Sequence, residues 1–447
     1  MESNPVLLPG VPQSLSAKFE GSFAYLTIRD RLPTILTKVI DTIHRNKNKF
    51  FEEYGEEGVE AEKRAISFLS KLRNELQTDK PVLVLEDAQE DTEAWNRYLQ
   101  YQRGLQGEHC PVSWFKSPWL YVECYMYRRI QEALCLNPPM SEFDVFCEGK
   151  TQSFLESTAA ITALCTHLQQ IRPTLTHTPE STLMDHLLTL LQVSLWGNKC
   201  DLSISAGRDN SQRVSPLDSL SALRAFVLLD DSRQVWAALR SGRDRGQRSR
   251  VQVDVVLDNA GFELLTDLVL ADFLLASGLA NQVRFHGKRF PWFVSDVTGR
   301  DFLWTVAQAA SSNHTHLSAC GGQWRRYLEE GAWSYHDHAF WTLPHEYCDM
   351  EWAAPDLYAS LSSAHLLLFK GDLNYRKLVG DRDWPHHTPF SVALRGFSPA
   401  SLCALRTLKA NVQVGLAVGQ GEGLSKDTPT WMTSGDYAVM QFHSPQQ

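Results

Sequence analysis

The sequence predicts an α/β protein in which a helical bundle domain precedes a three-layer α/β/α domain with a mostly parallel sheet. Two observations lead to this fold class. Apolar residues recur at helical spacing through the first ~200 residues. Beyond residue 250, short apolar runs of strand length alternate with helical segments. We expect a helical N-terminal domain over 1–203, a linker with one helix over 204–250, and the α/β/α domain over 251–447.

The helical half begins after Pro33, where apolar residues recur on one face at helical spacing. The segment 65–76 repeats the pattern with charges on its opposite face, and 118–134 and 181–196 are predicted to be further helices. We expect Ser117 to cap the third of these helices, with Pro118 as its first helical residue. No convincing alternating β-branched run interrupts this half.

The linker contains two polar, turn-rich segments, 204–216 and 241–250, around a predicted helix at 232–239. The second segment is basic. We interpret it as a solvated loop, although short basic runs also serve as nuclear-localisation signals.

The C-terminal half alternates between predicted strands and helices. We expect a crossover helix at 262–277 and strands at 251–257, 281–285, 364–369, 402–409 and 411–416. Continuous apolar strands indicate a sheet that is covered by helices on both faces. Ligands of such sheets bind beyond the carboxyl ends of the strands.

Composition narrows the class of protein. The 447 residues include 43 Lys+Arg and 52 Asp+Glu, a formal net charge of −9, which argues against a protein that coats nucleic acid or membrane. Asp267 and Asp272 interrupt the most apolar segment, which is therefore predicted to be a buried helix. The start of the sequence has no signal-peptide pattern, and the nine cysteines form no C-x-x-C pair. We expect a cytoplasmic location, with a nuclear one also open, and no direct nucleic-acid or membrane partner.

Polar side chains follow four of the predicted strands. They are Asp258 and Asn259, Asp296, the run Lys370–Lys377, and Arg406 with Lys409. Carboxylate and amide oxygens suit Mg²⁺, Mn²⁺ or a similar divalent cation. Arginine and lysine beside such a cation suit a phosphate group. Because a metal can polarise a phosphoryl oxygen and deprotonate a bound water, these strand ends indicate phosphoester hydrolysis.

Each strand end also has a purely structural interpretation. An aspartate after a strand is often the N-cap of the next helix, and Asp-Asn-x-Gly is ordinary turn chemistry. Lys370-Gly371-Asp372 is similar to a common turn. The metal-site hypothesis rests on four strand ends that agree in chemistry.

Longer motifs carry a specific resemblance. LDNAGFELLTDL (257–268), FVSD (293–296), FKGDLNYRKL (369–378) and RTLK (406–409) resemble the motifs of the metal-dependent damage-control phosphatases. Segments 21–41 and 194–203 resemble the same family, so the likeness covers nearly the whole chain. The RTLK run fits the R-T-x-K signature of the subfamily that acts on sugar phosphates.

The resemblance implies roles for particular residues. It places metal ligands at Asp258, Asn259 and Asp296 and catalytic roles on Asp258, Asp296 and Asp372. Substrate contacts are implied for Asp258, Asn259, Asp372, Leu373, Asn374, Tyr375, Arg376 and Lys409, with Asn198, Asp201 and Arg406 as supporting residues. It implies fructose 1-phosphate or fructose 6-phosphate as the substrate class, and Mn²⁺, Ni²⁺ or Co²⁺ as the metal.

The residue at position 260 narrows the choice of nucleophile for phosphoester hydrolysis. Phosphatases of the haloacid-dehalogenase type use an Asp-x-Asp pair, in which the first aspartate attacks phosphorus. Here the corresponding run is Asp258-Asn259-Ala260, so the second acid is missing. We therefore predict attack by metal-bound water, with Asp372 as a general acid or a positioning group.

Two other functions stay open. The resemblance also implies S-adenosylmethionine-dependent methylation of glutamate or aspartate carboxyl groups, on a protein such as the replication sliding clamp, with the cofactor near Glu263 and Asp296. The glycine-rich run 419–423 mimics a cofactor loop, but no second strand with an acid follows it, so we expect a flexible loop there. In the third hypothesis the bundle docks a partner and the α/β domain only senses a phosphorylated ligand.

Overall fold

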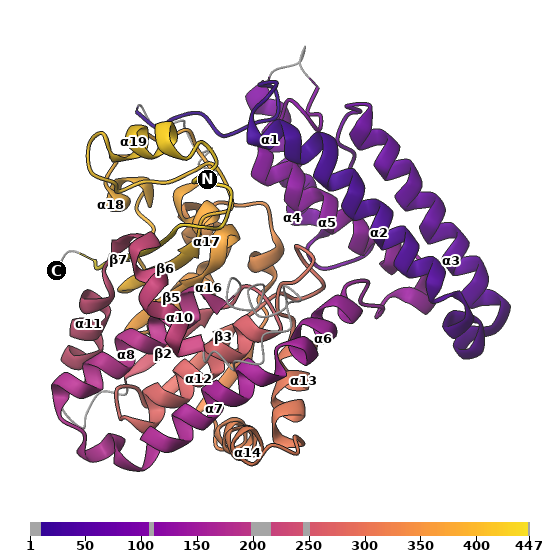
Figure 1. Cartoon of the computed structure of the whole chain (residues 1–447). Helices are drawn as coiled ribbons and strands as arrows, with labels where there is room; N and C mark the ends of the chain where they lie inside the picture. The colour runs from indigo at the N-terminus through magenta and orange to yellow at the C-terminus, as the bar shows by residue number, and fades with distance from the viewer. Residues whose placement is uncertain (1–9, 107–110, 198–215, 245–250, 446–447) are drawn as a thin grey trace.

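The protein is described here from a computed structural model, which covers residues 10–106, 111–197, 216–244 and 251–445. A bundle of long helices extends from a domain built around a sheet (Figure 1). The helices of the first half are α1 (Phe23–Leu26), α2 (Leu32–Arg45), α3 (Lys47–Gln77), α4 (Thr92–Gln106), α5 (Trp119–Cys135), α6 (Cys147–Glu156), α7 (Thr158–Ile171) and α8 (Glu180–Leu195). A π-helix, η1 (Thr27–Arg31), joins α1 to α2.

The remaining helices are α10 (Pro216–Leu223), α11 (Ser232–Asp244), α12 (Phe262–Ala276), α13 (Gly299–Ala310), α14 (Thr315–Glu329), α15 (Met350–Ala353), α16 (Pro355–Leu361), α17 (Gly371–Val379), α18 (Phe390–Ala393) and α19 (Gln420–Asp427). Short 3-10 turns are η2 (Pro138–Met140), η3 (Arg172–His177), η4 (Arg224–Phe226), η5 (Ala339–Thr342) and η6 (Tyr347–Asp349). Within the described residues no helix is both long enough and apolar enough to cross a membrane.

The bundle forms because its helices bury the apolar faces predicted from their spacing. In α2 the buried residues include Ile35, Leu36, Val39 and Ile43, and α3 packs along this face. Helix α5 is buried along almost its whole length and lies inside the bundle. It begins at Trp119, one residue later than expected, because Pro118 has an extended ψ of 132° and acts as the N-cap. The N-cap position is therefore Pro118 and not Ser117.

The sheet has seven strands in the order β1-β7-β6-β5-β2-β3-β4. The strands are β1 (Val227–Asp230), β2 (Gln252–Val256), β3 (Gln282–His286), β4 (Trp333–His336), β5 (Leu366–Lys370), β6 (Leu402–Thr407) and β7 (Ala438–His443). Strands β6, β5, β2, β3 and β4 run parallel, β7 is antiparallel to β6, and β1 is parallel to β7. The predicted mostly parallel α/β sheet is confirmed.

One predicted strand is wrong. Residues 411–416 are irregular, because their backbone binds side chains and a non-strand segment instead of a neighbouring strand. The amides of Gly415 and Leu416 donate to the carbonyl oxygens of Thr388 and His386. Arg406 donates to the carbonyl oxygens of Ala410 and Val412, at 3.0 and 2.5 Å. The amide of Val414 donates to the Tyr375 hydroxyl at 3.3 Å. The predicted loop at 419–423 is also wrong, since α19 begins there after Gly419 in a left-handed conformation.

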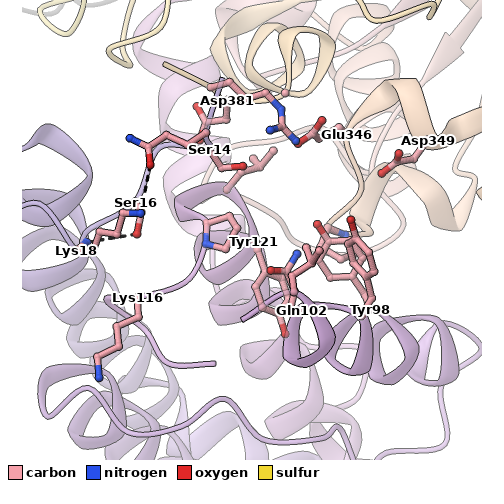
Figure 2. A pocket seen from close by; sticks show the side chains of 18 of the residues that line it. Ser14, Ser16, Lys18, Tyr98, Gln102, Lys116, Tyr121, Glu346, Asp349 and Asp381 are labelled. Atoms are coloured by element: carbon pink, nitrogen blue, oxygen red, sulfur yellow. Dashed lines mark hydrogen bonds and ion pairs between the residues drawn. The ribbon is translucent and has the colours of Figure 1, made fainter. Parts of the chain in front are cut away.

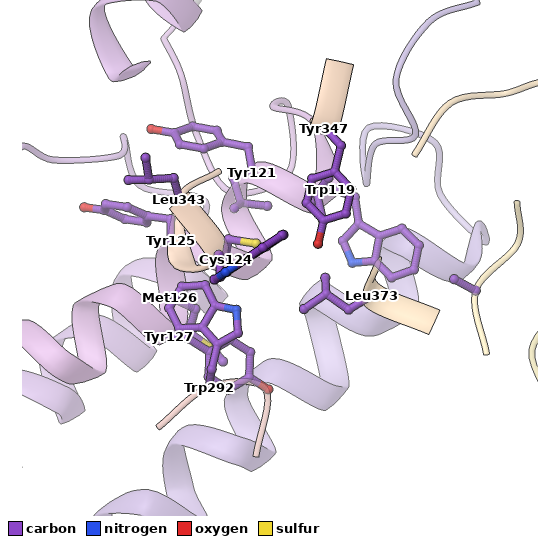
Figure 3. Packing of buried hydrophobic residues seen from close by; sticks show 14 of the residues in the cluster. Trp119, Tyr121, Cys124, Tyr125, Met126, Tyr127, Trp292, Leu343, Tyr347 and Leu373 are labelled. Carbon is purple, nitrogen blue, oxygen red and sulfur yellow. The ribbon is translucent and has the colours of Figure 1, made fainter. Parts of the chain in front are cut away.

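The two faces of the sheet are covered differently. Helices α7, α8, α12 and α14 pack together over one face, where alternate strand residues such as Val253, Val255, Leu366 and Leu368 share their core. The opposite face, with Leu367, Phe369, Leu402 and Ala404, belongs to the same core as the bundle. Figure 3 shows this junction, where α5 residues Trp119 and Cys124 lie near Leu343, Tyr347 and Leu373 of the sheet half.

Elements from the different expected domains pack against one another. Helices α7 and α8, which the sequence placed in the N-terminal helical domain, cover the sheet. The expected linker contributes strand β1 and helix α11, and α11 packs on β5 and β7. Periodicity identifies helices, but it does not say which apolar surface a helix will cover.

Candidate active site

The candidate site lies where the strand order reverses. Strands β2 and β5 are parallel neighbours, but the chain continues from β2 toward β3 and from β5 toward β6, on opposite sides. Such a switch point leaves a crevice beyond the carboxyl ends of the two strands. Asp258 follows β2, and Asp372 lies in the first turn of α17, directly after β5. The structure thus brings these predicted residues to one edge of the sheet.

The loops after β2 and β3 are held together by backbone pairing. Asn259 and Asp296 form an isolated bridge, and the amide of Val297 donates to the Asp258 carbonyl at 2.9 Å. The Asn259 side chain donates to Asp258 Oδ2 and Glu263 Oε2, both at 2.7 Å, and its own Oδ1 accepts from Ser295 at 2.5 Å. These bonds fix the three predicted metal ligands relative to one another.

Three carboxylates of this region repel one another. Burial, and then the charges of Glu263 and Asp296, raise the pKa of Asp258 well above its usual range, while Lys409 and Lys288 oppose the rise. Burial also raises the pKa of Asp296 to about 6, against the effect of Lys288. Lys288 Nζ lies 3.3 Å from Asp296 Oδ2. At both aspartates, burial and repulsion therefore outweigh the effect of the nearby lysines and disfavour the charged form.

The first residue of α17 contacts this acidic group. Gly371 has a φ of 82°, in the left-handed region, and a Cβ at this position would overlap the Asp258 carboxylate. Only glycine fits both the backbone conformation and the space. The amide groups of the first turn of α17 lie beside the site, and helix N-termini favour anions. The sequence interpretation of Lys370-Gly371-Asp372 as a turn did not foresee this contact.

Asp372 joins the ends of β5 and β6. Its Oδ1 accepts hydrogen bonds from Arg406 Nε at 2.7 Å and from the backbone amide of Lys409 at 3.0 Å. Arg406 is fully buried, and its guanidinium lies 4.2 Å from the centre of the Tyr375 ring. Of the two roles predicted for Asp372, this geometry favours positioning. It holds the backbone of Lys409, whose half-buried side chain is close enough to influence Asp258.

The other predicted substrate contacts on α17 point into the protein. Arg376 is buried, with its guanidinium bound by Glu123 at 2.8 Å and by Asp381 at 2.9 and 3.0 Å, and it stacks 3.8 Å from the Trp119 ring centre. Asn374 donates to carbonyl oxygens of β5 and of the residue after β2, and Tyr375 donates to Gln441. Leu373 is 5% exposed and belongs to the core. The structure does not direct these side chains toward Asp258.

Two features of the site were not found from sequence. Buried Lys370 binds Asp267 at 2.8 Å and Glu263 at 3.4 Å, so it partly neutralises the floor of the site. Phe293 and Val294, just before Asp296, have φ values of 43° and 73°. A left-handed conformation is unfavourable for bulky and β-branched residues and often marks functional sites. The FVSD run contains no glycine or asparagine that would have signalled this turn.

A cleft opens beside these residues. It has a volume of about 650 Å³ and lies between α2, α6 and the loops that carry Asn259 and Ser295. Lys38 and Arg45 of α2 line one wall, and Glu263 lines another. Asn198 and Asp201, which the sequence suggested as supporting residues, lie outside the described part of the chain.

The donor set fits a hard divalent cation. Asp258, Asn259 and Asp296 supply oxygen atoms from two adjoining loops. Asp296 Oδ2 is buried, and its nearest charged neighbour is the Lys288 ammonium at 3.3 Å. In the described ranges no cluster of three or more His, Cys, Asp or Glu side chains has the arrangement of a metal site. A ligand set here would therefore depend on the amide oxygen of Asn259 as well as on the two carboxylates.

Comparison with known proteins identifies the family of this chain. Residues 27–424 match the model of the damage-control phosphatase ARMT1-like domain. The chain belongs to this family. The damage-control phosphatase ARMT1 of Danio rerio is 65% identical over 437 residues, which cover 97% of each chain. The Homo sapiens protein of that name is 58% identical over 97% of this chain and 99% of its own.

A further curated relative agrees with this assignment. Damage-control phosphatase ARMT1 of Xenopus tropicalis is 61% identical and covers 96% of this chain and 98% of its own. Among solved structures, a DUF89 family protein from Pyrococcus horikoshii aligns over 78% of this chain and 88% of its own, with a TM-score of 0.38 and 13% identity. Membership of the ARMT1-like family implies a metal cofactor, which is the class of ligand that the donors at Asp258, Asn259 and Asp296 fit.

Proposed function

We propose that this ARMT1-like protein is a divalent-cation-dependent phosphatase of small phosphorylated metabolites, with fructose 1-phosphate and fructose 6-phosphate as the expected substrates. The observation that carries the proposal is the meeting of three elements at one switch point. They are the oxygen donors after β2 and β3, the N-terminus of α17, and Lys409 after β6.

The proposed ligands would hold the cation between two loops. Asp258 and Asp296 would provide its anionic donors, and the bonds of Asn259 to Asp258, Glu263 and Ser295 keep the loops in register. A bound cation such as Mn²⁺, Ni²⁺, Co²⁺ or Mg²⁺ would polarise a phosphoryl oxygen and lower the pKa of an attacking water.

The substrate phosphate would lie against the start of α17. Backbone amides of residues 371–373 belong to the first turn, where helix N–H groups lack intrahelical acceptors. Of the resemblance-based contacts, the one at Leu373 is compatible with this arrangement if its backbone amide makes it. The amides of Asn374 and Tyr375 lie where intrahelical acceptors, the carbonyls of residues 370 and 371, are already available. Lys409 would add a positive charge opposite Asp258.

The surroundings of Ala260 and Asp258 favour water over an aspartate as the nucleophile. Ala260 occupies the position where an Asp-x-Asp phosphatase has its second acid, and it is 8% exposed. Its amide donates to the Ser295 carbonyl at 2.8 Å, so the position serves to pair the two loops. Asp258 Oδ2 accepts from Asn259 and lies against Gly371, which leaves it poorly placed for in-line attack.

The test measures phosphate release from fructose 1-phosphate and fructose 6-phosphate. The full chain is treated with EDTA and then supplied with Mn²⁺, Ni²⁺, Co²⁺ or Mg²⁺ separately. We expect turnover to disappear with EDTA, to return with metal, and to be absent in Asp258→Asn and Asp296→Asn. Metal-loaded protein that hydrolyses no phosphoester would contradict the proposal, as would a phospho-enzyme trapped by rapid quench.

The alternative function is S-adenosylmethionine-dependent methylation of protein carboxyl groups, with the replication sliding clamp as a candidate partner. The observation that favours it is the volume of the cleft, about 650 Å³, which can hold a ligand larger than a sugar phosphate next to Glu263. The run 419–423 gives it no support, because the segment before α19 is irregular and Gly421 packs against His386. Transfer of a labelled methyl group to the clamp, lost in Glu263→Gln, would establish this function.

The binding-module hypothesis predicts that phosphorylated ligands bind but are never turned over. The same phosphate-release assay separates it from the phosphatase.

A further inference from the structure

The two predicted ligands that follow β2 differ in how they can face a cation. The carboxylate of Asp258 has two oxygen atoms, whereas the side-chain amide of Asn259 has one oxygen and one nitrogen. Only the amide oxygen is a ligand for a hard divalent cation. The contribution of Asn259 therefore depends on the groups that hold its NH₂ away from the cation.

The hydrogen-bond partners of Asn259 fix its orientation. Its Nδ2 donates to Asp258 Oδ2 and Glu263 Oε2, both at 2.7 Å, and its Oδ1 accepts from Ser295 Oγ at 2.5 Å. A carboxylate accepts hydrogen bonds and a hydroxyl can donate one, so a reversed amide would direct its oxygen at two acceptors. The amide oxygen consequently faces the loop that carries Asp296, the residue after Ser295.

Glu263 is held in turn by Lys370. The Lys370 ammonium lies 3.4 Å from Glu263 Oε1, and it also binds Asp267 Oδ1 and the Ser194 carbonyl, each at 2.8 Å. The Lys370 and Glu263 side chains are 1% and 7% exposed. The lysine therefore binds one oxygen of the Glu263 carboxylate and leaves the other, Oε2, to Asn259.

Packing also restrains Glu263, which lies in the first turn of α12. Gly197, just after α8, lies directly against it. A Cβ atom built on Gly197 would come within 3.1 Å of Glu263 Cα and 3.2 Å of its Cγ. The carboxylate is therefore directed at Asn259 both by its ion pair and by the close approach of the α8 end.

The end of β5 supports both ligands that follow β2. Lys370 is the last residue of β5 and acts on Asn259 through Glu263. The next residue, Gly371, lies against the Asp258 carboxylate. Two consecutive residues of one strand end thus determine how the neighbouring strand presents its ligands.

Helix α17, which begins directly after β5, is anchored at its far end beside a second cavity of about 240 Å³. Figure 2 shows this cavity, with Tyr98 and Tyr121 on the bundle side and Asp381 across from them. Asp381 follows the helix and binds Arg376, which also binds Glu123 of α5. The bundle therefore restrains α17, and with it the end of β5 that supports the ligands.

We propose that Glu263 is a positioning residue of the cation site and that Lys370 keeps it in this role. Through its bond to Asn259 Nδ2, Glu263 turns the amide oxygen toward the cation and is not itself a ligand. Groups behind the ligands commonly orient them in this way. The inference rests on the ligand set of the proposed phosphatase, but it concerns cation binding and not turnover.

The test is a double-mutant cycle on Mn²⁺ affinity, measured by electron paramagnetic resonance with the full chain. Glu263→Gln keeps the shape of the side chain. Since Lys370 binds an acceptor, the new amide should direct its oxygen at the lysine and its NH₂ at Asn259, which favours the reversed Asn259 amide. We expect Glu263→Gln to weaken Mn²⁺ binding by about tenfold or more in the wild-type chain, and by much less in Asn259→Asp. A carboxylate at position 259 has no reversed orientation.

The cycle separates orientation from charge, because the lost charge of Glu263 acts in both backgrounds. Equal losses of affinity in the two backgrounds would overturn the proposal. The matched control is Glu148→Gln, which removes a 72% exposed acid of the same cleft whose ion pair is with Arg45. It should change Mn²⁺ affinity by no more than about twofold, because solvent screens its charge.

A second measurement uses the unmodified chain, so it does not depend on the folding of a variant. Crystals soaked with Mn²⁺ locate the cation by its anomalous signal. A cation bonded to the Asn259 side chain on its Ser295 side, with Glu263 outside the coordination shell, supports the proposal. A Glu263 oxygen bonded to the cation, or Asn259 outside the shell, contradicts it.

Phosphate release from fructose 1-phosphate by the same variants separates this inference from the proposed function. Mn²⁺ binding that shows the expected coupling but no turnover in any variant contradicts the phosphatase and supports the positioning role. Turnover together with equal losses of affinity in the two backgrounds contradicts the positioning role alone.

Discussion

A Cβ atom built on Gly371 would lie 1.9 Å from Oδ2 of Asp258. The first residue of α17 and a predicted metal ligand are thus in direct contact, across the boundary between β5 and β2. Any side chain at 371 must displace the carboxylate or the helix start. The position of the helix N-terminus relative to the donors is set by this one contact.

Gly371→Ala should therefore inactivate the protein without unfolding it. Displacement of a catalytic carboxylate by about 1 Å costs on the order of 100-fold in rate. Phosphate release from fructose 1-phosphate, with and without Mn²⁺, checks the effect. Gly322→Ala in α14 is the control, because no atom lies near its Cβ and alanine should add up to about 1 kcal/mol of stability. Wild-type turnover by Gly371→Ala would show that the contact does not matter.

Asp258→Asn should stabilise the metal-free protein. A carboxyl group whose pKa is raised on folding lowers stability once the pH exceeds its unfolded pKa, and this cost grows until the folded pKa is reached. Removing the charge should raise the unfolding free energy at pH 7.5 in EDTA. Urea denaturation measures it. Mn²⁺ should stabilise the wild type but not the variant. A less stable metal-free variant would mean that Asp258 is better solvated than its neighbours indicate.

Lys409→Ala should separate substrate binding from metal binding. The side chain carries charge toward Asp258, but it is not an oxygen donor, so Mn²⁺ affinity measured by electron paramagnetic resonance should be unchanged. The KM for phosphoesters should rise about tenfold or more, which corresponds to roughly 1.4 kcal/mol. If Mn²⁺ affinity falls together with KM, Lys409 also organises the metal ligands.

Arg376→Gln tests whether this arginine contacts substrate or supports the fold. Its guanidinium is already bound by Glu123 and Asp381, so truncation leaves two buried carboxylates unpaired. The unfolding free energy should fall by about 3–5 kcal/mol while KM changes little at a temperature where the variant is folded. A large rise in KM with unchanged stability would instead support the substrate contact that the family resemblance implies for Arg376.

Lys377 should make stability depend on pH in the alkaline range. Burial lowers its pKa from 10.5 to about 8, and its Nζ donates to the Leu343 carbonyl at 2.5 Å. Between these pH values the unfolded chain binds the proton and the folded chain does not, so stability rises with pH. The unfolding free energy of the wild type should increase relative to Lys377→Met by up to about 3 kcal/mol from pH 8 to 10. A constant difference would contradict a neutral buried lysine.

The central fold was predictable because its strands are continuously apolar. The runs that became β2, β3, β5 and β6, and the crossover helix α12, were all identified within a few residues. Strands β1 and β4 have only four residues each and lie at the sheet edges. There, pairing with a neighbouring strand decides more than residue composition whether a segment forms a strand. The irregular path of 411–416 follows from contacts that its apolar pattern does not reveal. Arg406 donates to the Val412 carbonyl, and the amides of Gly415 and Leu416 donate to carbonyl oxygens of Thr388 and His386.

The site was partly predictable for the same reason. The carboxyl ends of parallel strands converge, so Asp258, Asn259 and Asp372 were expected to meet, and they lie at the same edge. The contacts of Arg376 were not predictable, since Glu123 and Trp119 belong to a bundle helix whose docking on α17 leaves no mark in the local sequence. The roles of the predicted ligands stay predictions until a metal is bound.

The position of strand β1 at the edge of the sheet affects how the chain folds during its synthesis. Strand β1 at 227–230 pairs only with β7 among the described strands, and β7 spans 438–443. As the protein leaves the ribosome, β1 has no neighbour until nearly all of the remaining sequence has emerged. Until then its apolar side chains and its unpaired backbone groups stay exposed. A chaperone, or a strand that pairs incorrectly, would therefore first compete with native folding at this segment.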